Sequence, residues 1–225
     1  MAYFHTCPWA FFCITWTVML VTLLIMNQQA RHFYTLDVVL RKFSIFQLEF
    51  PASPQELSIL IKGIYALPPD TCKRSLRALK GQLYTDFFYM FGVYGSIHVL
   101  CHELAMHAGG VAFTVFIFLS LGQFLAWACD IVENIYLLQK INNKGAASSP
   151  GVHRAYQVLE IVKWGLALTG ATLAISTLSY DWLTGQYQLA SLPALGVVVL
   201  LTMAYAIAAV LLNRRKITVP QVAGN

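Results

Sequence analysis

Five apolar runs are spaced along the chain, and each has the length of a helix that crosses a lipid bilayer. They cover residues 8–26, 86–106, 111–139, 158–178 and 192–213. A transmembrane helix needs about 17 to 25 predominantly apolar residues. The pattern therefore predicts an all-α integral membrane protein with five transmembrane helices, of which the second, third and fourth contain ionisable side chains.

The segment between the first two runs, residues 27–85, is amphipathic instead. Ser53-Pro54-Gln55-Glu56 is typical of a capped helix start, and Leu and Ile then recur at helical spacing until Pro68. A second amphipathic helix follows, in which Gly81 allows a bend before the chain enters the bilayer at Asp86. Residues 36–50 fit an interfacial strand or an interfacial helix equally well. We expect an interfacial helical segment whose cations either only set the topology or also shield a site at the cytoplasmic leaflet.

The composition supports a membrane protein. Hydrophobic residues make up 58% of the 225 residues and charged residues only 11%, with a mean hydropathy of +0.62. Soluble domains carry about 25% charged residues, so the chain cannot cover an ordinary water-facing surface. The same numbers fit a disordered protein or a disulfide scaffold poorly.

The placement of the basic residues predicts an orientation. Residues 27–85 hold eight of the fifteen Lys and Arg, residues 140–163 hold four and residues 214–216 hold three, whereas residues 1–7, 107–110 and 179–191 hold none. Basic loops stay in the cytoplasm, so the N-terminus is expected outside and the C-terminus inside the cell membrane. The net charge of +5 therefore reflects topology, and no nucleic-acid partner is predicted.

These boundaries divide the chain into four parts. They are a first transmembrane helix (1–26), a cytoplasmic interfacial segment (27–85), a four-helix transmembrane bundle (86–213) and a cytoplasmic tail (214–225).

A polar stripe in the third run is the main candidate for function. Asp130, Glu133, Asn134 and Gln123 share one face at about 100° of rotation per residue. Each ionisable group at membrane depth costs about 2.5–3.5 kcal/mol and by default marks function. The antiparallel second run brings Asp86 to the same depth, and Lys163 at the start of the fourth run is the expected internal partner. The predicted ligand-binding residues are Asp86, Gln123, Asp130, Glu133, Asn134 and Lys163.

Three interpretations of this cluster stay open. Three carboxyl groups in a low dielectric cannot all be ionised without a cation nearby. The cluster is therefore a structural salt-bridge network, a pocket for a ligand or substrate, or a metal site.

A weaker metal site is suggested in the second run. His98 and His102 are four residues apart, a spacing that allows two imidazoles to bind one metal ion on a helix face. They lie toward the outer half of the membrane, away from the predicted acidic cluster, and hydrogen bonds to other helices or a place at the outer interface explain them better. The sequence does not identify a cofactor, and hydrolase, metalloprotease, P-loop and dinucleotide-binding motifs do not occur.

Three short motifs occur in order between Phe43 and Leu138: Leu48-Glu49-Phe50, Asp86-Phe87 and the Asp-x-x-Glu-Asn run that ends at Asn134. In this stretch the chain resembles a set of small uncharacterised bacterial multi-span membrane proteins. The resemblance implies that Glu49 joins Asp86, Asp130, Glu133 and Asn134 in one constellation, and it implies no reaction.

The leading functional hypothesis is a protein that binds or processes a lipid or other amphiphile through the intramembrane acidic cluster. A membrane enzyme with Asp130 or Glu133 as general acid or base is a second class. A non-catalytic structural subunit of a larger membrane complex is a third. Membrane lipids are the expected partners in every case, with further membrane subunits or copies of the chain as additional candidates.

Overall fold

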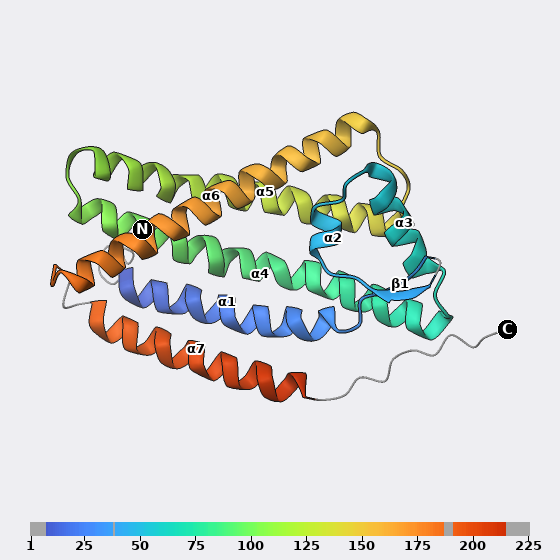
Figure 1. The fold of residues 1–225 in the computed structure, drawn as a ribbon, viewed down its shortest axis with the longest axis horizontal. Helices are drawn as coiled ribbons and strands as arrows, with labels where there is room; N and C mark the ends of the chain where they lie inside the picture. The colour runs from blue at the N-terminus through green and yellow to red at the C-terminus, as the bar shows by residue number, and fades with distance from the viewer. Residues whose placement is uncertain (1–7, 38, 187–190, 215–225) are drawn as a thin grey trace.

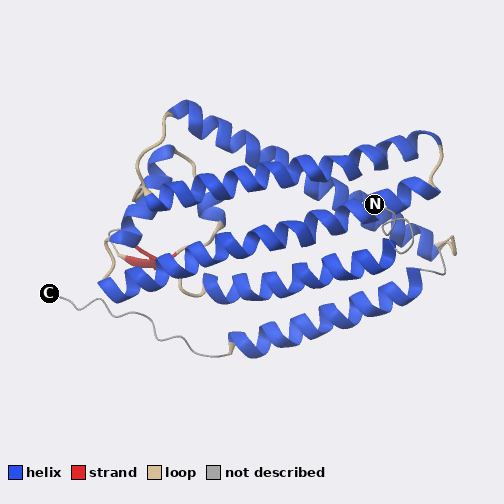
Figure 2. Cartoon of the chain, turned by 180° about the vertical axis from the view of Figure 1, so that it is seen from behind, coloured by secondary structure: helices blue, strands red, loops and turns tan. Residues whose placement is uncertain are grey.

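The computed structural model describes residues 8–37, 39–186 and 191–214. In these residues it contains seven helices and one small hairpin, and the predicted all-α class is confirmed (Figures 1 and 2). The five long helices are α1 (Pro8–Ala30), α4 (Pro69–His107), α5 (Gly110–Asn142), α6 (Pro150–Leu183) and α7 (Ser191–Asn213). The smaller elements are β1 (Tyr34–Leu36), β2 (Leu40–Lys42), α2 (Phe46–Glu49) and α3 (Pro54–Tyr65).

The long helices run between the same two ends of the molecule (Figure 1). One end, here called the hairpin end, carries the hairpin, α2, α3 and the connection from α5 to α6. The other, the short-loop end, carries the connection from α4 to α5, the last residues of α6 and the first residues of α7. Each long helix therefore runs antiparallel to the next long helix in the chain.

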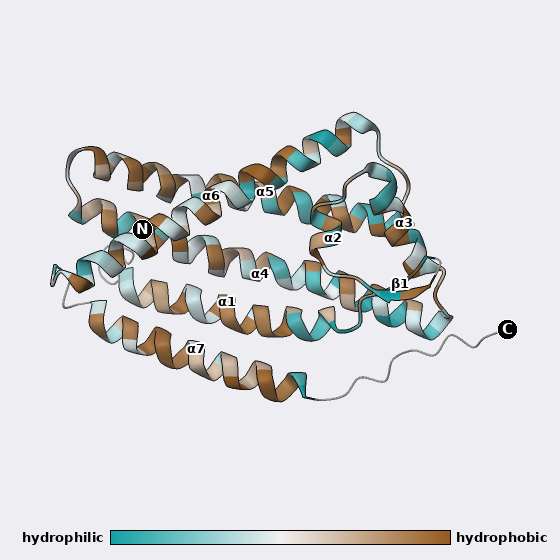
Figure 3. Cartoon of the chain, viewed as in Figure 1, coloured by the Kyte–Doolittle hydropathy of each residue, from teal (hydrophilic) through white to brown (hydrophobic). Residues whose placement is uncertain are grey.

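Four of these helices are long and apolar enough to cross a membrane, namely α1, α5, α6 and α7. The second predicted span lies within α4, which does not belong to this group because its apolar half also carries His98, His102 and Glu103. Figure 3 shows α7 and the short-loop half of α5 as almost continuously hydrophobic, whereas hydrophilic residues gather on the hairpin halves of α4, α5 and α6.

Helix α4 differs from the sequence expectation because it continues without interruption through Gly81 and Asp86. The helix is not interrupted at Gly81, where the sequence allowed a bend, and the expected boundary between residues 85 and 86 falls inside it. Gly81 serves a close approach instead, since a Cβ there would come within 2.8 Å of Gln29 Nε2 on α1. Gly92 does the same further along, where a Cβ would lie 2.6 Å from the backbone nitrogen of Met19. Missing side chains thus let α1 and α4 pack closely.

The segment that connects α1 to α4 folds into a compact cap at the hairpin end. Residues 36–50 contain both elements left open by the sequence, strand β2 and helix α2. The predicted start of α3 is confirmed, since Ser53 Oγ accepts a hydrogen bond from the Glu56 amide at 3.1 Å. Apolar side chains of this cap join those of the long helices in one core, whose fully buried members include Phe33, Leu48, Leu57, Ile61, Leu79, Leu137 and Ile141.

Helix α7 packs at the edge of the bundle, against α1. The Trp16 indole donates to Thr202 Oγ1 at 3.1 Å, and Asn27 Nδ2 donates to the Tyr205 hydroxyl at 3.0 Å. Only Ser191 and Ala194 of α7 are buried. The predicted tail lies outside the described residues from residue 215 onward.

Candidate functional site: a buried carboxylate–lysine network

Lys163 on α6 is the centre of a group of buried charges. Its ammonium lies 3.3 Å from Asp130 Oδ1 and 3.0 Å from Glu160 Oε2, and it also forms an ion pair with Glu133. Lys163 is 4% exposed, and each of these three carboxylate residues is at most 7% exposed. The name carboxylate–lysine network is used below for Glu49, Asp86, Asp130, Glu133, Glu160 and Lys163.

The polar stripe of α5 faces the interior of the bundle. Asn134 Nδ2 donates to Asp86 Oδ2 at 2.7 Å and to the Leu83 carbonyl at 3.3 Å, which ties the stripe to α4. The Tyr94 hydroxyl, also on α4, donates to Asp130 Oδ2 at 2.8 Å. The antiparallel packing of α4 and α5 therefore places Asp86 beside the end of the stripe, as their depths in the sequence suggested.

Five of the six residues singled out from the sequence come together here: Asp86, Asp130, Glu133, Asn134 and Lys163. Gln123, the sixth, lies on the same buried face but nearer the short-loop end. Its Nε2 donates to the Leu119 and Leu166 carbonyls at 3.1 and 3.2 Å, and its Oε1 is buried without a hydrogen-bond partner.

Two important residues were missed by the sequence analysis. Glu160 is fully buried and lies one turn before Lys163, so the pairing of an acid and a lysine three residues apart inside an apolar run was the available signal. Tyr94 carried no signal of its own, because tyrosines are common in apolar helices. Glu49 was implicated only by the family resemblance.

Helix α2 brings Glu49 to the network. Leu48, the residue before it, is fully buried, and its carbonyl accepts a hydrogen bond from the Tyr156 hydroxyl at 3.1 Å. The Phe46 ring lies 6.0 Å from the Trp164 ring, centroid to centroid. These contacts fix α2 against α6, and carboxylate oxygens of Glu49, Glu133 and Glu160 all lie within 4.8 Å of one another.

Carboxyl groups outnumber ammonium groups five to one in this network. Oε2 of Glu49 and Oε1 of Glu160 are buried without a hydrogen-bond partner. Burial, opposed by the Lys163 ammonium, raises the pKa of Glu49 to about 7. The network can therefore take up a proton or another cation near neutral pH.

Glu49, Glu133 and Glu160 also offer the closest grouping of metal-ligand atoms in the described part of the chain. Carboxylate oxygens suit hard cations such as Ca²⁺. The Lys163 ammonium already contacts two of these three groups, so a metal ion would have to bind beside an existing cation. Any further cation here, whether a metal ion or an ammonium group, would therefore share these oxygens with Lys163.

The paired histidines lie outside the network. His98 Nδ1 is 2.8 Å from Ser120 Oγ, and its ring centroid is 6.0 Å from that of His102. His102 Nδ1 lies 3.7 Å from Glu103 Oε1. The structure thus does not bring the weaker metal candidates to the acidic cluster.

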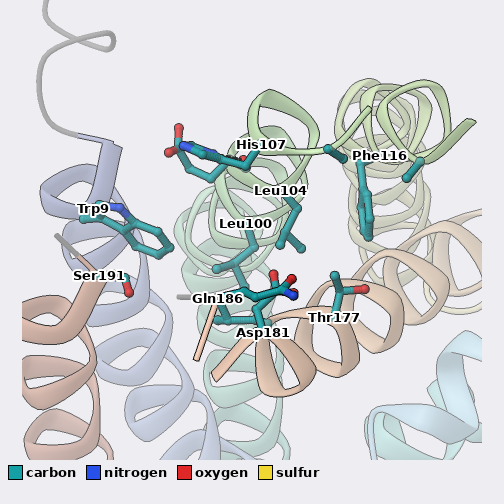
Figure 4. A pocket seen from close by; sticks show the side chains of 13 residues that line it. Trp9, Leu100, Leu104, His107, Phe116, Thr177, Asp181, Gln186 and Ser191 are labelled. Carbon is teal, nitrogen blue, oxygen red and sulfur yellow. Dashed lines mark hydrogen bonds between the residues drawn. The ribbon is translucent and has the colours of Figure 1, made fainter. Parts of the chain in front are cut away.

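Two cavities lie between the network and the short-loop end of the bundle. The first, of about 180 Å³, lies between α1, α4 and α5 and is lined by Phe11, Phe91, Tyr94, His98, Gln123 and Trp127, among others. The second, of about 220 Å³, lies at the short-loop end, where Figure 4 shows Trp9, His107, Phe116 and Asp181 from four different helices around it. Tyr94 belongs both to the first cavity and to the hydrogen bond with Asp130, so this cavity adjoins the carboxylate–lysine network.

Comparison with known proteins identifies no relative of this chain. No protein-family model matches the chain, and no curated protein or solved structure is detectably similar to it.

Proposed function

We propose that this is a five-span protein of the cell membrane, with its C-terminus in the cytoplasm, that binds an amphiphile with a cationic amine headgroup. The headgroup binds at the carboxylate–lysine network from the cytoplasmic leaflet. The observation that carries the proposal is the gathering of three carboxylates, those of Glu49, Glu133 and Glu160, within 4.8 Å of one another around a single lysine.

The length of α4 supports a fifth span. At about 1.5 Å per residue its 39 residues extend over about 58 Å, against about 30 Å for the hydrocarbon core. The half after Asp86 is long enough to cross, which leaves the basic half in the cytoplasm. All of the basic loop residues that the structure describes then lie on one side, in agreement with the positive-inside rule.

The surplus of acceptors supports an amine headgroup. An ammonium group brings three donors and one positive charge, and the network offers acceptor oxygens without donors on Glu49 and Glu160. A carboxylate or phosphate headgroup would add a further negative charge to a site in which carboxyl groups already outnumber the single ammonium. A neutral alcohol would satisfy the acceptors without balancing the charge.

Apolar surface beside Glu49 supports an attached hydrocarbon chain. Phe46 and Phe50 flank Glu49 on the cap and are 55% and 48% exposed, and Ile161 on α6 is 68% exposed. A chain that lies along α6 beside these side chains keeps its headgroup at the level of Glu49 and Glu160. Exposed aromatic and aliphatic residues at an interface are the surface that such a chain buries.

A direct binding experiment tests this proposal. The purified protein in detergent is titrated with hexadecylamine, hexadecanol and hexadecanoic acid, and binding is followed by tryptophan fluorescence, since Trp164 lies beside α2. We expect the amine to bind best and Glu49→Gln or Glu160→Gln to weaken its binding about tenfold, or ~1.4 kcal/mol. Glu103→Gln, which removes a carboxylate near the short-loop end, is the matched control and should bind as the native protein does.

Two results would reject the amine headgroup. One is equal binding of the amine and the alcohol, and the other is native affinity in both Glu49→Gln and Glu160→Gln. Competition of the amine by Ca²⁺ or Mg²⁺ in the micromolar range would instead favour a metal site at Glu49, Glu133 and Glu160.

A second candidate function is that of a structural subunit, and helix α7 favours it. Its Val199, Leu200 and Met203 side chains are 46%, 68% and 57% exposed, and lipid or a neighbouring protein must cover this face. Native mass spectrometry of the protein extracted in mild detergent distinguishes the two: a homo-oligomer or a bound second subunit supports the structural function, and a monomer carrying only lipid supports the first proposal.

A further inference from the structure

Titratable side chains follow one another along the bundle from the cap to the short-loop end. We propose that they form a proton pathway across the membrane, which enters at Glu49, passes through the carboxylate–lysine network to Asp130 and Tyr94, and leaves through His98, His102 and Glu103. The pathway goes beyond amphiphile binding and needs no bound amphiphile, although it shares the membrane-spanning placement of the helices.

The half nearest the hairpin end consists of closely spaced titratable groups. Glu49 is partly exposed at the cap, and its carboxylate lies within 4.8 Å of those of Glu133 and Glu160. The Lys163 ammonium contacts both of the latter and lies 3.3 Å from Asp130 Oδ1. Every group from the cap surface to Asp130 thus lies within the reach of a proton transfer, directly or through one water molecule.

Tyr94 turns the pathway from α5 and α6 onto α4. Its hydroxyl lies 2.8 Å from Asp130 Oδ2. His98 and His102 follow at steps of four residues, so all three side chains lie on one face of α4. The two imidazole centroids are 6.0 Å apart, a separation that one water molecule bridges.

The cavity between α1, α4 and α5 joins Tyr94 to His98, since both line it. Its volume of about 180 Å³ is several times the roughly 30 Å³ that a water molecule occupies in the liquid. A buried water molecule needs two to four polar partners. Tyr94, His98 and Gln123 are the polar side chains around this cavity, whose lining is otherwise apolar. A water molecule therefore enters only when one of them turns a polar atom toward the cavity, and Gln123 Oε1, which is buried without a hydrogen-bond partner, is one such atom.

The exit lies at the second cavity. His102 Nδ1 is 3.7 Å from Glu103 Oε1, and Glu103 lines the cavity of about 220 Å³ at the short-loop end together with His107 (Figure 4). A proton on Glu103 therefore reaches the outer surface without crossing an apolar layer.

Each step exchanges one O–H or N–H bond for another, and no oxidant or reductant takes part. Asp130 gives a proton to the Tyr94 oxygen while Tyr94 releases its own proton toward the cavity. A water molecule there passes a proton to the neutral His98 ring, and His102 and Glu103 follow in turn. For every proton taken up at Glu49 one proton leaves at Glu103, so the protein ends with its original charge.

Proton flux in proteoliposomes tests the pathway. The full-length protein is reconstituted into vesicles that contain a pH-sensitive dye, and a potassium gradient with valinomycin supplies the driving voltage. We expect the native protein to acidify or alkalinise the lumen according to the sign of the voltage. His98→Gln, which keeps a hydrogen bond to Ser120 but cannot titrate, should lower the rate to that of protein-free vesicles, and Tyr94→Phe should do the same.

Matched substitutions off the pathway provide the controls. His32→Gln lies in the loop after α1, and Tyr136→Phe removes a hydroxyl that pairs with Ser148. Both should conduct as the native protein does. Native rates in both His98→Gln and Tyr94→Phe would overturn the pathway, as would a native protein that conducts no faster than empty vesicles.

One of these variants separates this inference from the proposed function. His98→Gln lies outside the carboxylate–lysine network, so it should bind hexadecylamine with native affinity, which also shows that it is folded. Amine binding without proton flux would end the pathway and keep the amphiphile site. Proton flux without amine binding would reject the amphiphile site and keep the pathway.

Discussion

Helices α5 and α7 are both long, apolar and able to span a membrane, but they have opposite relations to the rest of the protein. α5 buries ten residues, among them Gln123, Asp130, Glu133 and Asn134. α7 buries only Ser191 and Ala194 and carries no ionisable group before its end apart from Tyr205. Hydropathy identifies both helices equally well, whereas the polar stripe identifies the one that belongs in the centre.

The largest loss of stability is expected when the positive charge that pairs with the polar stripe of α5 is removed. Lys163→Met leaves the buried carboxylates without their only ammonium and should destabilise the fold by about 3–5 kcal/mol. Thermal unfolding in detergent measures this, with the exposed Lys73→Met as the control. Adding Glu133→Gln to Lys163→Met should recover part of the loss, and no recovery would mean that the ammonium acts through packing and not through charge.

The next largest loss of stability is expected from a buried apolar residue on the same face of α5. Leu137 is fully buried in the core shared with the cap, so Leu137→Ala should cost about 2–5 kcal/mol through lost contacts and a cavity. Unfolding measured at several detergent concentrations gives the value. Ile135→Ala, two residues away and 46% exposed, is the control. Equal losses in the two variants would contradict the orientation of α5.

A pH-dependent effect is expected at Glu49, because its pKa rises from an ordinary 4.5 to about 7 in the folded protein. The folded state then binds more protons than the unfolded state between these values, so native stability falls as the pH rises from about 4.5 to 7. The glutamine of Glu49→Gln does not titrate. The stability of this variant should therefore rise relative to that of the native protein over this range, by on the order of 3 kcal/mol. Melting temperatures of both proteins at pH 5 and pH 8.5 test this, and a constant difference would contradict it.

The smallest change in stability is expected from a substitution on the exposed face of α7. Val199 is 46% exposed, and Val199→Ala should change the stability of the monomer by no more than about 0.5 kcal/mol. A larger loss, or a change of mass in native mass spectrometry, would show that another protein covers this face and would sharpen the case for a structural subunit.

Much of this contrast was predictable from the sequence because helical periodicity is a local property. The shared face of Asp130, Glu133 and Asn134 follows from rotation along one helix, and Lys163 was the only basic residue inside the later runs. The position of Glu49 was not predictable in this way, since it depends on the fold of a cap that packs through Leu48 and Tyr156. The uninterrupted α4 was missed for a similar reason: Gly81 looks like a hinge until Gln29 of another helix is placed against it.

The contact between the first and the last helix has a consequence for the order of assembly during synthesis. Trp16, Asn27 and Arg31 of the α1 region contact Thr202, Tyr205 and Leu212 of α7. At about 5–20 residues per second, translation needs about 10–40 s to proceed from residue 30 to residue 213. Throughout that time one flank of α1 lacks its partner, so a newly inserted chain offers a temporary docking surface to insertion factors or to the α7 of another copy.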